Sequence, residues 1–95
     1  MSAAYETIMV LNTKLDEEAT KALIEKFTSL IAENGAVESV DEWGKRRLAY
    51  EIMDETEGYY VLVNFTSDTA FPKELDRVYK ITDGVLRSII VRKDA

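Results

Sequence analysis

Apolar and polar positions recur with two different periods along this chain, and together they predict six elements. Stretches rich in β-branched and large apolar residues predict strands over residues 5–11, 37–53, 59–65 and 85–92. Apolar residues at helical spacing predict one helix over residues 16–33 and a second that begins after residues 67–69 and ends at residues 83–84. The order βαββαβ predicts an α+β fold, the ferredoxin-like sandwich, with two helices on one face of a four-stranded antiparallel sheet.

The other face of such a sheet has no helix to cover it. Alternation along residues 59–65 puts Val61, Val63 and Phe65 on the helix side, together with Tyr59 as a core residue. Tyr60 and Leu62 then stand on the open face. Because exposed apolar groups on a flat sheet mark an interaction surface, we expect a partner there.

Glycines and polar runs predict where the chain turns. Gly44 interrupts the strand over residues 37–53 and predicts a bulge or bend that turns residues 45–52 away from residues 37–43. Residues 54–58 are polar and predict the hairpin connection to the next strand. Asn34 and Gly35 end the first helix, with Gly35 free to adopt a positive φ.

Composition removes most kinds of chemistry. The 95 residues suit one domain over residues 1–95, and the absence of His and Cys excludes zinc sites, thiol nucleophiles and His relays. The acidic runs 16–18 and 54–57 lack the spacing of a calcium loop. We therefore expect no enzyme, cofactor, metal or small-molecule substrate. The sequence has no apolar run of membrane-spanning length and no signal peptide, so we expect no membrane partner and a cytoplasmic location.

The net charge of −6 is unevenly distributed. Residues 1–44 hold nine acids and three bases, whereas residues 45–95 hold nine of each. A net negative chain repels a polyanion at long range, although salt screens exposed charges beyond roughly 8 Å and lets a local basic patch act. If the chain binds RNA, we expect it to need help from a basic partner.

Two cationic sets are the candidate contacts. Lys45, Arg46 and Arg47 follow Gly44, and alternation puts Lys45 and Arg47 on one face and Arg46 on the other. The planar guanidinium of arginine and the compact ammonium of lysine both bind phosphate. The alternative interpretation is a charged edge strand that discourages aggregation, which has the same pattern. The second set comprises Arg87, Arg92 and Lys93, with Arg87 and Arg92 on opposite faces of an edge strand; ordinary solvated charges are the alternative interpretation.

Aromatic residues add weaker candidates. Tyr59 and Tyr60 invite comparison with RNA-recognition-motif domains, which stack bases on strand aromatics. The match is partial, because Glu57 stands where that motif has a cation. Tyr60 remains a candidate contact, and Trp43 is interpreted as a packing anchor at the bend, with a stacking platform as the alternative.

The run from Gly44 to Ile52 resembles the signature of a known family, protein six of the bacterial small ribosomal subunit. Matching positions are Gly44, Arg46, Arg47, Leu48, Ala49, Tyr50 and Ile52. Met53 departs from it, because the family usually has a small or basic residue there. Tyr5-Glu6 and Gly58-Tyr59-Tyr60 also resemble the family, and the resemblance spans nearly the whole chain.

The resemblance implies a structural constituent of the ribosome that binds the central domain of small-subunit ribosomal RNA. It also implies a partner, the small and basic ribosomal protein eighteen. We expect the RNA and protein contacts among a set of eight residues: Tyr5, Lys45, Arg46, Arg47, Tyr60, Arg87, Arg92 and Lys93.

Two other functions fit the same fold. The first is an RNA-recognition-like or ligand-binding regulatory module, although the four glycines are too scattered to form a ligand-binding turn. The second is an acylphosphatase-like enzyme, which would need an anion-binding loop after the first strand. Asn12-Thr13-Lys14 occupies that position instead.

Overall fold

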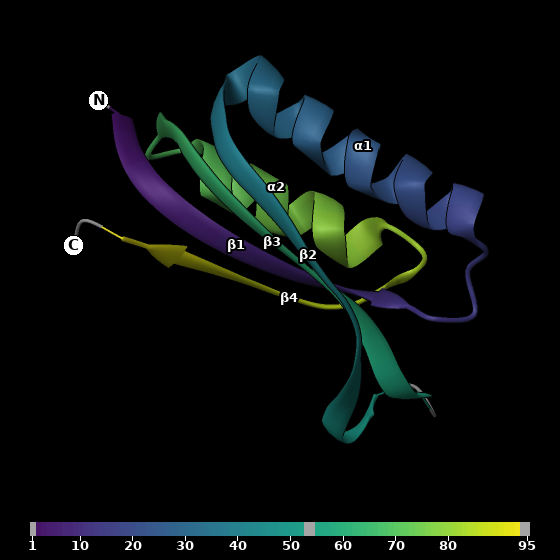
Figure 1. The fold of residues 1–95 in the computed structure, drawn as a ribbon. Coiled ribbons are helices and arrows are strands. Elements are labelled where there is room, and N and C mark those ends of the chain that lie inside the picture. Colours follow the sequence, from purple (N-terminus) through teal and green to yellow (C-terminus); the bar gives the residue numbers. More distant parts are fainter. Residues whose placement is uncertain (1, 53–54, 94–95) are drawn as a thin grey trace.

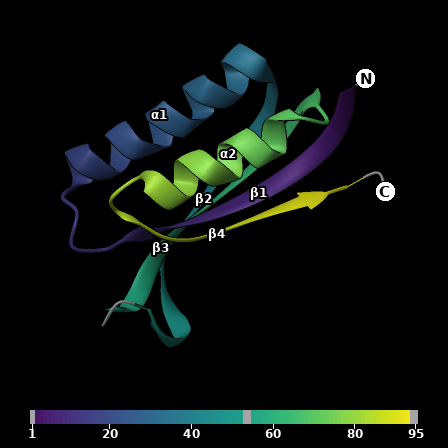
Figure 2. The same ribbon diagram turned by 180° about the vertical axis from the view of Figure 1, so that it is seen from behind.

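The computed structural model describes residues 2–52 and 55–93, and it has the predicted order of elements. Its helices and strands are β1 (Ser2–Asn12), α1 (Glu17–Asn34), β2 (Gly35–Ile52), β3 (Glu55–Asp68), α2 (Phe71–Ile81) and β4 (Val85–Arg92). The four strands form one antiparallel sheet in the order β2-β3-β1-β4. Figure 1 shows α1 and α2 on the same face of this sheet, and Figure 2 shows the arrangement from behind. The ferredoxin-like fold is confirmed, with β1 central and β4 at an edge.

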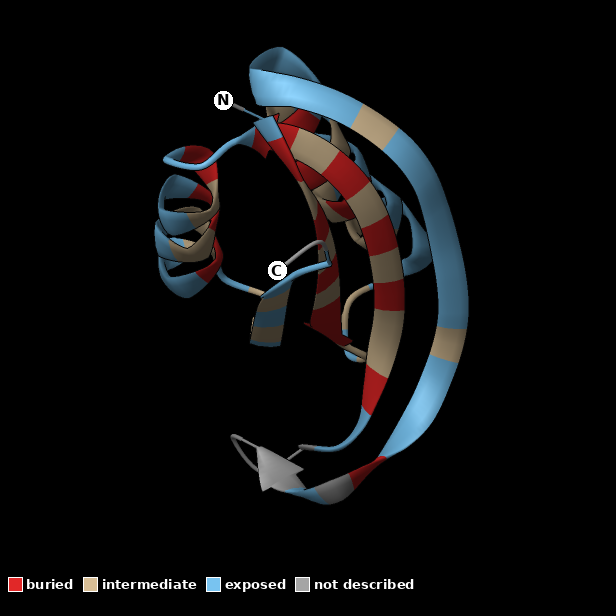
Figure 3. Ribbon diagram, turned by 90° about the vertical axis from the view of Figure 1, so that its left-hand side faces the viewer, coloured by how far each residue is buried: buried red, intermediate tan, exposed pale blue. Residues whose placement is uncertain are grey.

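The core lies between the helices and one face of the sheet. β3 contributes Val61, Val63 and Phe65, which are fully buried, and α1 contributes Phe27 and Ile31. Residues 60, 62 and 64 on the opposite side of β3 are half-buried, as the alternation predicts. Figure 3 shows this alternation along the inner strands and the contrasting exposure of β2 at the edge. Tyr59 packs against the core from its margin.

A carboxylate accepts amide hydrogen bonds at the start of each helix. Asp16 accepts a hydrogen bond from the Ala19 amide at 2.7 Å, which satisfies one of the unpaired amides of the first turn of α1. Asp68, one of the predicted capping residues, accepts hydrogen bonds from the amides of Ala70 and Phe71 at 3.0 and 2.9 Å. α2 ends at Ile81, slightly before the predicted end, and Gly84 has a φ of 94° in the turn to β4.

One prediction about turns is confirmed in part and another is wrong. α1 ends at Asn34 with Gly35 as its C-cap, as predicted, but Gly35 does not use a positive φ: its φ of 178° is extended, and β2 begins directly after α1. Residues 55–58 are not a hairpin connection, because β3 begins at Glu55 and pairs with β2 there. Strand pairing in this segment depends on backbone hydrogen bonds, and Thr56 and Glu57 remain exposed. The sequence therefore shows no alternation of apolar residues here that would predict a strand. Met53 and Asp54 lie outside the described residues.

The prediction for Gly44 is confirmed. Its φ is 81°, and the β2–β3 register shifts between Glu42 and Gly44. A bulge of this kind bends a strand and increases its twist. Figure 1 shows the result: beyond the bulge, the β2–β3 hairpin leaves the plane of the sheet and projects beyond it.

A buried hydrogen bond joins the two sides of the core. The Thr7 hydroxyl lies 3.0 Å from the Tyr79 hydroxyl and donates to the Ile89 carbonyl at 3.0 Å. It therefore accepts from Tyr79. Burial raises the pKa of Tyr79 from 10.0 to about 12.

This pKa predicts alkaline sensitivity. Between pH 10 and pH 12 the unfolded state loses the Tyr79 proton while the folded state keeps it, so stability that is complete below pH 10 is lost as pH rises to about 12. The loss should be about 2 to 3 kcal/mol. We expect denaturant unfolding to show it in the wild type. Tyr79→Phe is the control, and an equally steep alkaline loss in that variant would contradict the assignment to Tyr79.

Candidate nucleic-acid interface

The open face of the sheet carries an apolar row across three strands. Leu62, Ile8 and Ile89 are register partners on β3, β1 and β4, so their side chains lie side by side on that face. Ile89 is 41% exposed, and Val91, two residues further along β4, is 53% exposed. This face therefore has an apolar strip across three strands, of which the sequence predicted Leu62.

The hairpin beyond Gly44 packs onto one end of the open face. Leu48 and Val10 are 9% and 4% exposed, although neither belongs to the core beneath the helices. Gly58 lies between them: a Cβ there would meet Val10 at 2.3 Å and Leu48 at 3.2 Å. The absence of a side chain at Gly58 is what lets the hairpin approach the sheet.

The three hairpin cations point to two sides, as predicted. Arg46 pairs with Gly58 and is exposed on the open-face side. Lys45 pairs with Tyr59 and lies on the helix side, and Arg47, also exposed, pairs with Glu57. The structure thus separates Lys45 from Arg46.

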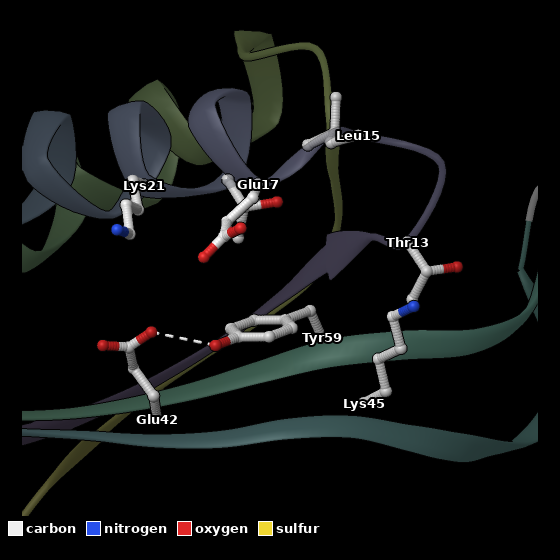
Figure 4. Close-up of a pocket in the computed structure, with 8 residues that line it drawn as sticks. Thr13, Leu15, Glu17, Lys21, Glu42, Lys45 and Tyr59 are labelled. Atoms are coloured by element: carbon white, nitrogen blue, oxygen red, sulfur yellow. Dashed lines mark hydrogen bonds between the residues drawn. The ribbon is translucent and has the colours of Figure 1, made fainter.

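Lys45 helps to line a cavity between the start of α1 and the β2–β3 pair. The cavity has a volume of about 360 Å³. Its lining comprises Thr13, Leu15, Glu17, Thr20, Lys21, Glu42, Lys45 and Tyr59. Figure 4 shows Lys45 reaching from β2 toward Thr13, and the Tyr59 hydroxyl donating to Glu42 at 2.9 Å. That hydrogen bond raises the pKa of Tyr59, and burial and the charges of Glu42 and Glu17 act in the same direction. With two acids and two lysines in its wall, the cavity favours neither sign of charge.

The second cationic set meets the hairpin at one point. Arg87 on β4 donates to the Tyr50 hydroxyl at 2.9 Å, although 37 residues separate them. Lys93 donates to the Asn64 side chain at 3.1 Å on the open face. Arg92 pairs with Tyr5 and alternates with Arg87, so it belongs to the opposite side of β4. The two sets therefore join through Arg87 and Tyr50.

The two tyrosine candidates have different surroundings. Tyr60 stacks on Trp43 with ring centres 6.2 Å apart and planes 15° apart, and Trp43 remains 39% exposed. Trp43 is thus not a buried anchor. Tyr5 is 6% exposed and stacks on Phe65 at 5.5 Å. The expectation of a surface contact at Tyr5 does not fit its place in the core, because the helices cover that side of β1.

Comparison with known proteins settles the class of molecule. A family model described as ribosomal protein S6 matches residues 4–92. The chain belongs to the ribosomal protein S6 family. Small ribosomal subunit protein bS6 of Clostridium perfringens (strain SM101 / Type A) is 60% identical over 91 residues, which cover 95% of this chain and 96% of that protein. The bS6 protein of Clostridium botulinum (strain 657 / Type Ba4) is 56% identical over 95% of this chain and 97% of its own length.

A solved structure agrees. The crystal structure of 30S ribosomal protein S6 from Thermotoga maritima superposes with a TM-score of 0.92 at 28% identity, covering 98% of this chain and 89% of that one. Membership of the S6 family confirms the predicted resemblance and the predicted place in the small subunit of the cytoplasmic ribosome. It also confirms the predicted part in RNA binding and translation and the non-enzymatic role. Across the described residues, neither helix has the length and apolar character of a membrane span.

The candidate set from the sequence omitted Tyr50, which lies within the S6 signature. Tyr50 is 61% exposed, yet its hydroxyl accepts a hydrogen bond from Arg87. A single tyrosine at an exposed strand position gives no sign of a partner 37 residues away. The signal available was the signature itself, since it contains a tyrosine two residues after Leu48.

Removing the Tyr50 hydroxyl should loosen the hairpin without unfolding the chain. In Tyr50→Phe we expect hairpin amides to exchange about two- to fivefold faster, because an exposed hydrogen bond contributes about 0.5 to 1 kcal/mol. Hydrogen exchange by NMR measures this. Arg87→Met should have the same effect, and the double variant should add little to either. Additive effects of the two changes would contradict a direct coupling.

Proposed function

We propose that this S6 family member binds the central domain of small-subunit ribosomal RNA jointly with the small basic ribosomal protein eighteen. Its role is that of a scaffold: the two proteins pair, and the pair docks on folded RNA through phosphate and sugar contacts that fix position more than they read sequence. RNA helices are recognised largely by shape and backbone contacts, which suits a surface of exposed cations.

The observation that carries the proposal is the junction of the two cationic sets at one end of the open face. Arg87 is held against the hairpin by Tyr50, and Arg46 projects on that same side, whereas Arg47 projects from the opposite side of the hairpin. Arginine forks bind phosphate oxygens well, and several cations on one rigid surface match a folded backbone better than isolated ones. We assign the RNA contact to Arg46, Arg87 and Lys93 on the open-face side, with Arg47 and Arg92 on the opposite side of their strands. Tyr5 is left out, because it is buried.

Net charge supports the need for a second protein. At −6 the chain as a whole repels RNA, and a basic partner would reverse the field of the pair. The apolar row formed by Leu62, Ile8 and Ile89 offers that partner a surface to bury. Arg46 and Arg87 lie on the same face as the apolar row, so this face has room for both the RNA and the partner protein.

A competition experiment tests the choice of RNA. The pair is titrated with a labelled central-domain fragment in the presence of unlabelled fragments of the other small-subunit RNA domains. We expect only the central-domain fragment to displace the label at nanomolar to micromolar concentrations. Equal displacement by fragments of every domain would show nonspecific electrostatic binding and overturn the proposal.

A further inference from the structure

The junction between α1 and β2 is an asparagine followed by a glycine. α1 ends at Asn34 and β2 begins at Gly35 without a loop between them, as Figure 1 shows, and both residues are exposed to water. Because glycine has no Cβ, its backbone nitrogen is the least shielded by a side chain of any residue's. The Gly35 nitrogen is therefore the most accessible nucleophile that an asparagine can have as its neighbour.

We propose that Asn34 is a site of spontaneous deamidation, and that the folded junction slows the reaction until the start of β2 opens. The Gly35 nitrogen attacks the side-chain carbonyl carbon of Asn34 and forms a C–N bond. The bond from that carbon to the side-chain nitrogen breaks, the Gly35 amide proton passes through water to the departing nitrogen, and ammonia leaves. Water then opens the resulting succinimide ring on either side. One product is aspartate, and the other is isoaspartate, in which the main chain runs through the former side chain.

The helical conformation of Asn34 keeps the reacting atoms apart. Its side-chain nitrogen donates a hydrogen bond at 2.9 Å to the carbonyl of Leu30, one turn back in α1. Every Cα–Cβ bond of a helix tilts toward the helix N-terminus, so the side chain leans away from the residue that follows. Ring closure therefore requires Asn34 to leave the helical conformation and to break this hydrogen bond.

The strand ladder restrains Gly35 on the other side of the reacting bond. Gly35 and Ser67 are the first register pair of β2 and β3, and a Cβ on Gly35 would lie 2.0 Å from the Thr66 carbonyl oxygen. Val37, two residues further along, packs against the core. The Gly35 nitrogen cannot turn toward Asn34 while these contacts hold, so the first residues of β2 must separate from β3. The close approach to Thr66 also requires glycine at this position, which is the residue that makes Asn34 reactive.

Neither product restores the junction. Aspartate at position 34 cannot donate to the Leu30 carbonyl. It also adds a negative charge beside Glu33 at a helix C-terminus, where the macrodipole disfavours it and the last turn has no basic residue. Isoaspartate lengthens the main chain by an extra carbon atom at a connection without a loop, where Gly35 has no spare room. Deamidation thus marks chains whose junction has opened, and isoaspartate is the more disruptive product.

The chain contains its own controls, because it has three asparagines and no glutamine. Asn12 and Asn64 precede a threonine and a phenylalanine, whose side chains crowd the attacking nitrogen. The whole chain is incubated at mildly alkaline pH with and without guanidinium chloride, and tryptic peptides are analysed by mass spectrometry. The peptide of residues 27–45 has Asn34 as its only side-chain amide. We expect it to deamidate in denaturant, and about tenfold or more slowly in the folded chain, because only the open fraction then reacts.

Val37→Ala tests the part played by the start of β2, because it removes packing there and leaves the Asn-Gly pair unchanged. Deamidation of the folded chain should become about three- to fivefold faster. Ile81→Ala is the matched control, since Ile81 is an exposed apolar residue on α2, and its rate should stay within twofold of wild type. Thermal unfolding should show both variants folded. An unchanged rate in Val37→Ala, or equal rates in the folded and denatured wild type, overturns the control by the fold. Equally fast deamidation of Asn12 or Asn64 in denaturant overturns the assignment to Asn34.

Asn34→Asp separates the effect of charge from that of backbone length, because it carries the carboxylate on an ordinary main chain. The isoaspartate form is purified by chromatography after the incubation in denaturant and returned to native buffer. We expect its unfolding midpoint, measured by circular dichroism, to lie below that of Asn34→Asp. A midpoint equal to or above that of Asn34→Asp overturns the disruption assigned to the longer main chain.

Discussion

Replacing Arg46 and Arg47 together with alanine should weaken binding of the central-domain RNA by the protein pair about 30- to 100-fold. Both side chains are exposed on the hairpin that Leu48 and Tyr50 hold over the open face. Charge-assisted hydrogen bonds to phosphate contribute about 1 to 1.5 kcal/mol each, and each tenfold change in affinity corresponds to 1.4 kcal/mol. The slope of log affinity against log salt should fall by about 1.5.

The control variant removes two cations from the helix layer, away from the hairpin. Lys73 and Lys80 lie on α2, are exposed, and change the net charge by the same amount when replaced by alanine. Electrophoretic mobility shift or filter binding across a salt series measures both variants. If the α2 variant loses as much affinity as Arg46→Ala/Arg47→Ala, RNA binding depends on net charge alone. That result would contradict a direct contact between the hairpin and the RNA.

Gly35→Ala should destabilise the fold by about 2 to 4 kcal/mol, which is a large fraction of the stability of a small domain. The reason is steric. A Cβ on Gly35 would lie 2.0 Å from the Thr66 carbonyl oxygen and 3.0 Å from Ser67, in the first pair of the β2–β3 ladder. A backbone carbonyl that is fixed in the strand ladder cannot rotate away. The start of β2, directly after α1, would therefore have to separate from β3.

Gly44→Ala is the informative comparison. Nothing lies within 4 Å of a Cβ at Gly44, so its cost comes from the φ of 81° and should be about 1 to 2 kcal/mol. Urea unfolding followed by circular dichroism gives both values. The account requires the larger loss at Gly35; a larger loss at Gly44 would mean that backbone strain at the bulge outweighs close approach at the ladder.

The fold was predictable from the sequence wherever burial imposes a period. Val61, Val63 and Phe65 alternate because one side of β3 is buried, and Phe71, Leu75 and Tyr79 recur at helical spacing because one side of α2 is buried. Burial leaves no such trace at Glu57, where the ladder continues through exposed residues. Gly35 was misread for a related reason: its close approach to Thr66 is a contact between distant segments, and a glycine alone does not distinguish it from a positive φ.

The site was predictable in part. Alternation placed Arg46 and Arg87 correctly with respect to the faces of their strands, and the signature drew attention to the hairpin. The sequence did not reveal the hydrogen bond from Arg87 to Tyr50, because that contact depends on how far the Gly44 bulge bends the hairpin. Tyr5 was placed among the contacts by family likeness, whereas the alternation of β1 puts it beside Phe65 in the core.

Partner dependence is the central claim, and one measurement tests it most directly. The affinity of the chain for the central-domain RNA is measured at near-physiological salt, with and without saturating ribosomal protein eighteen, beside a titration of that protein alone. A chain with a net charge of −6 should bind the RNA weakly by itself, and the pair should bind at least 100-fold tighter than either protein alone. Equal affinity with and without the second protein would contradict the account.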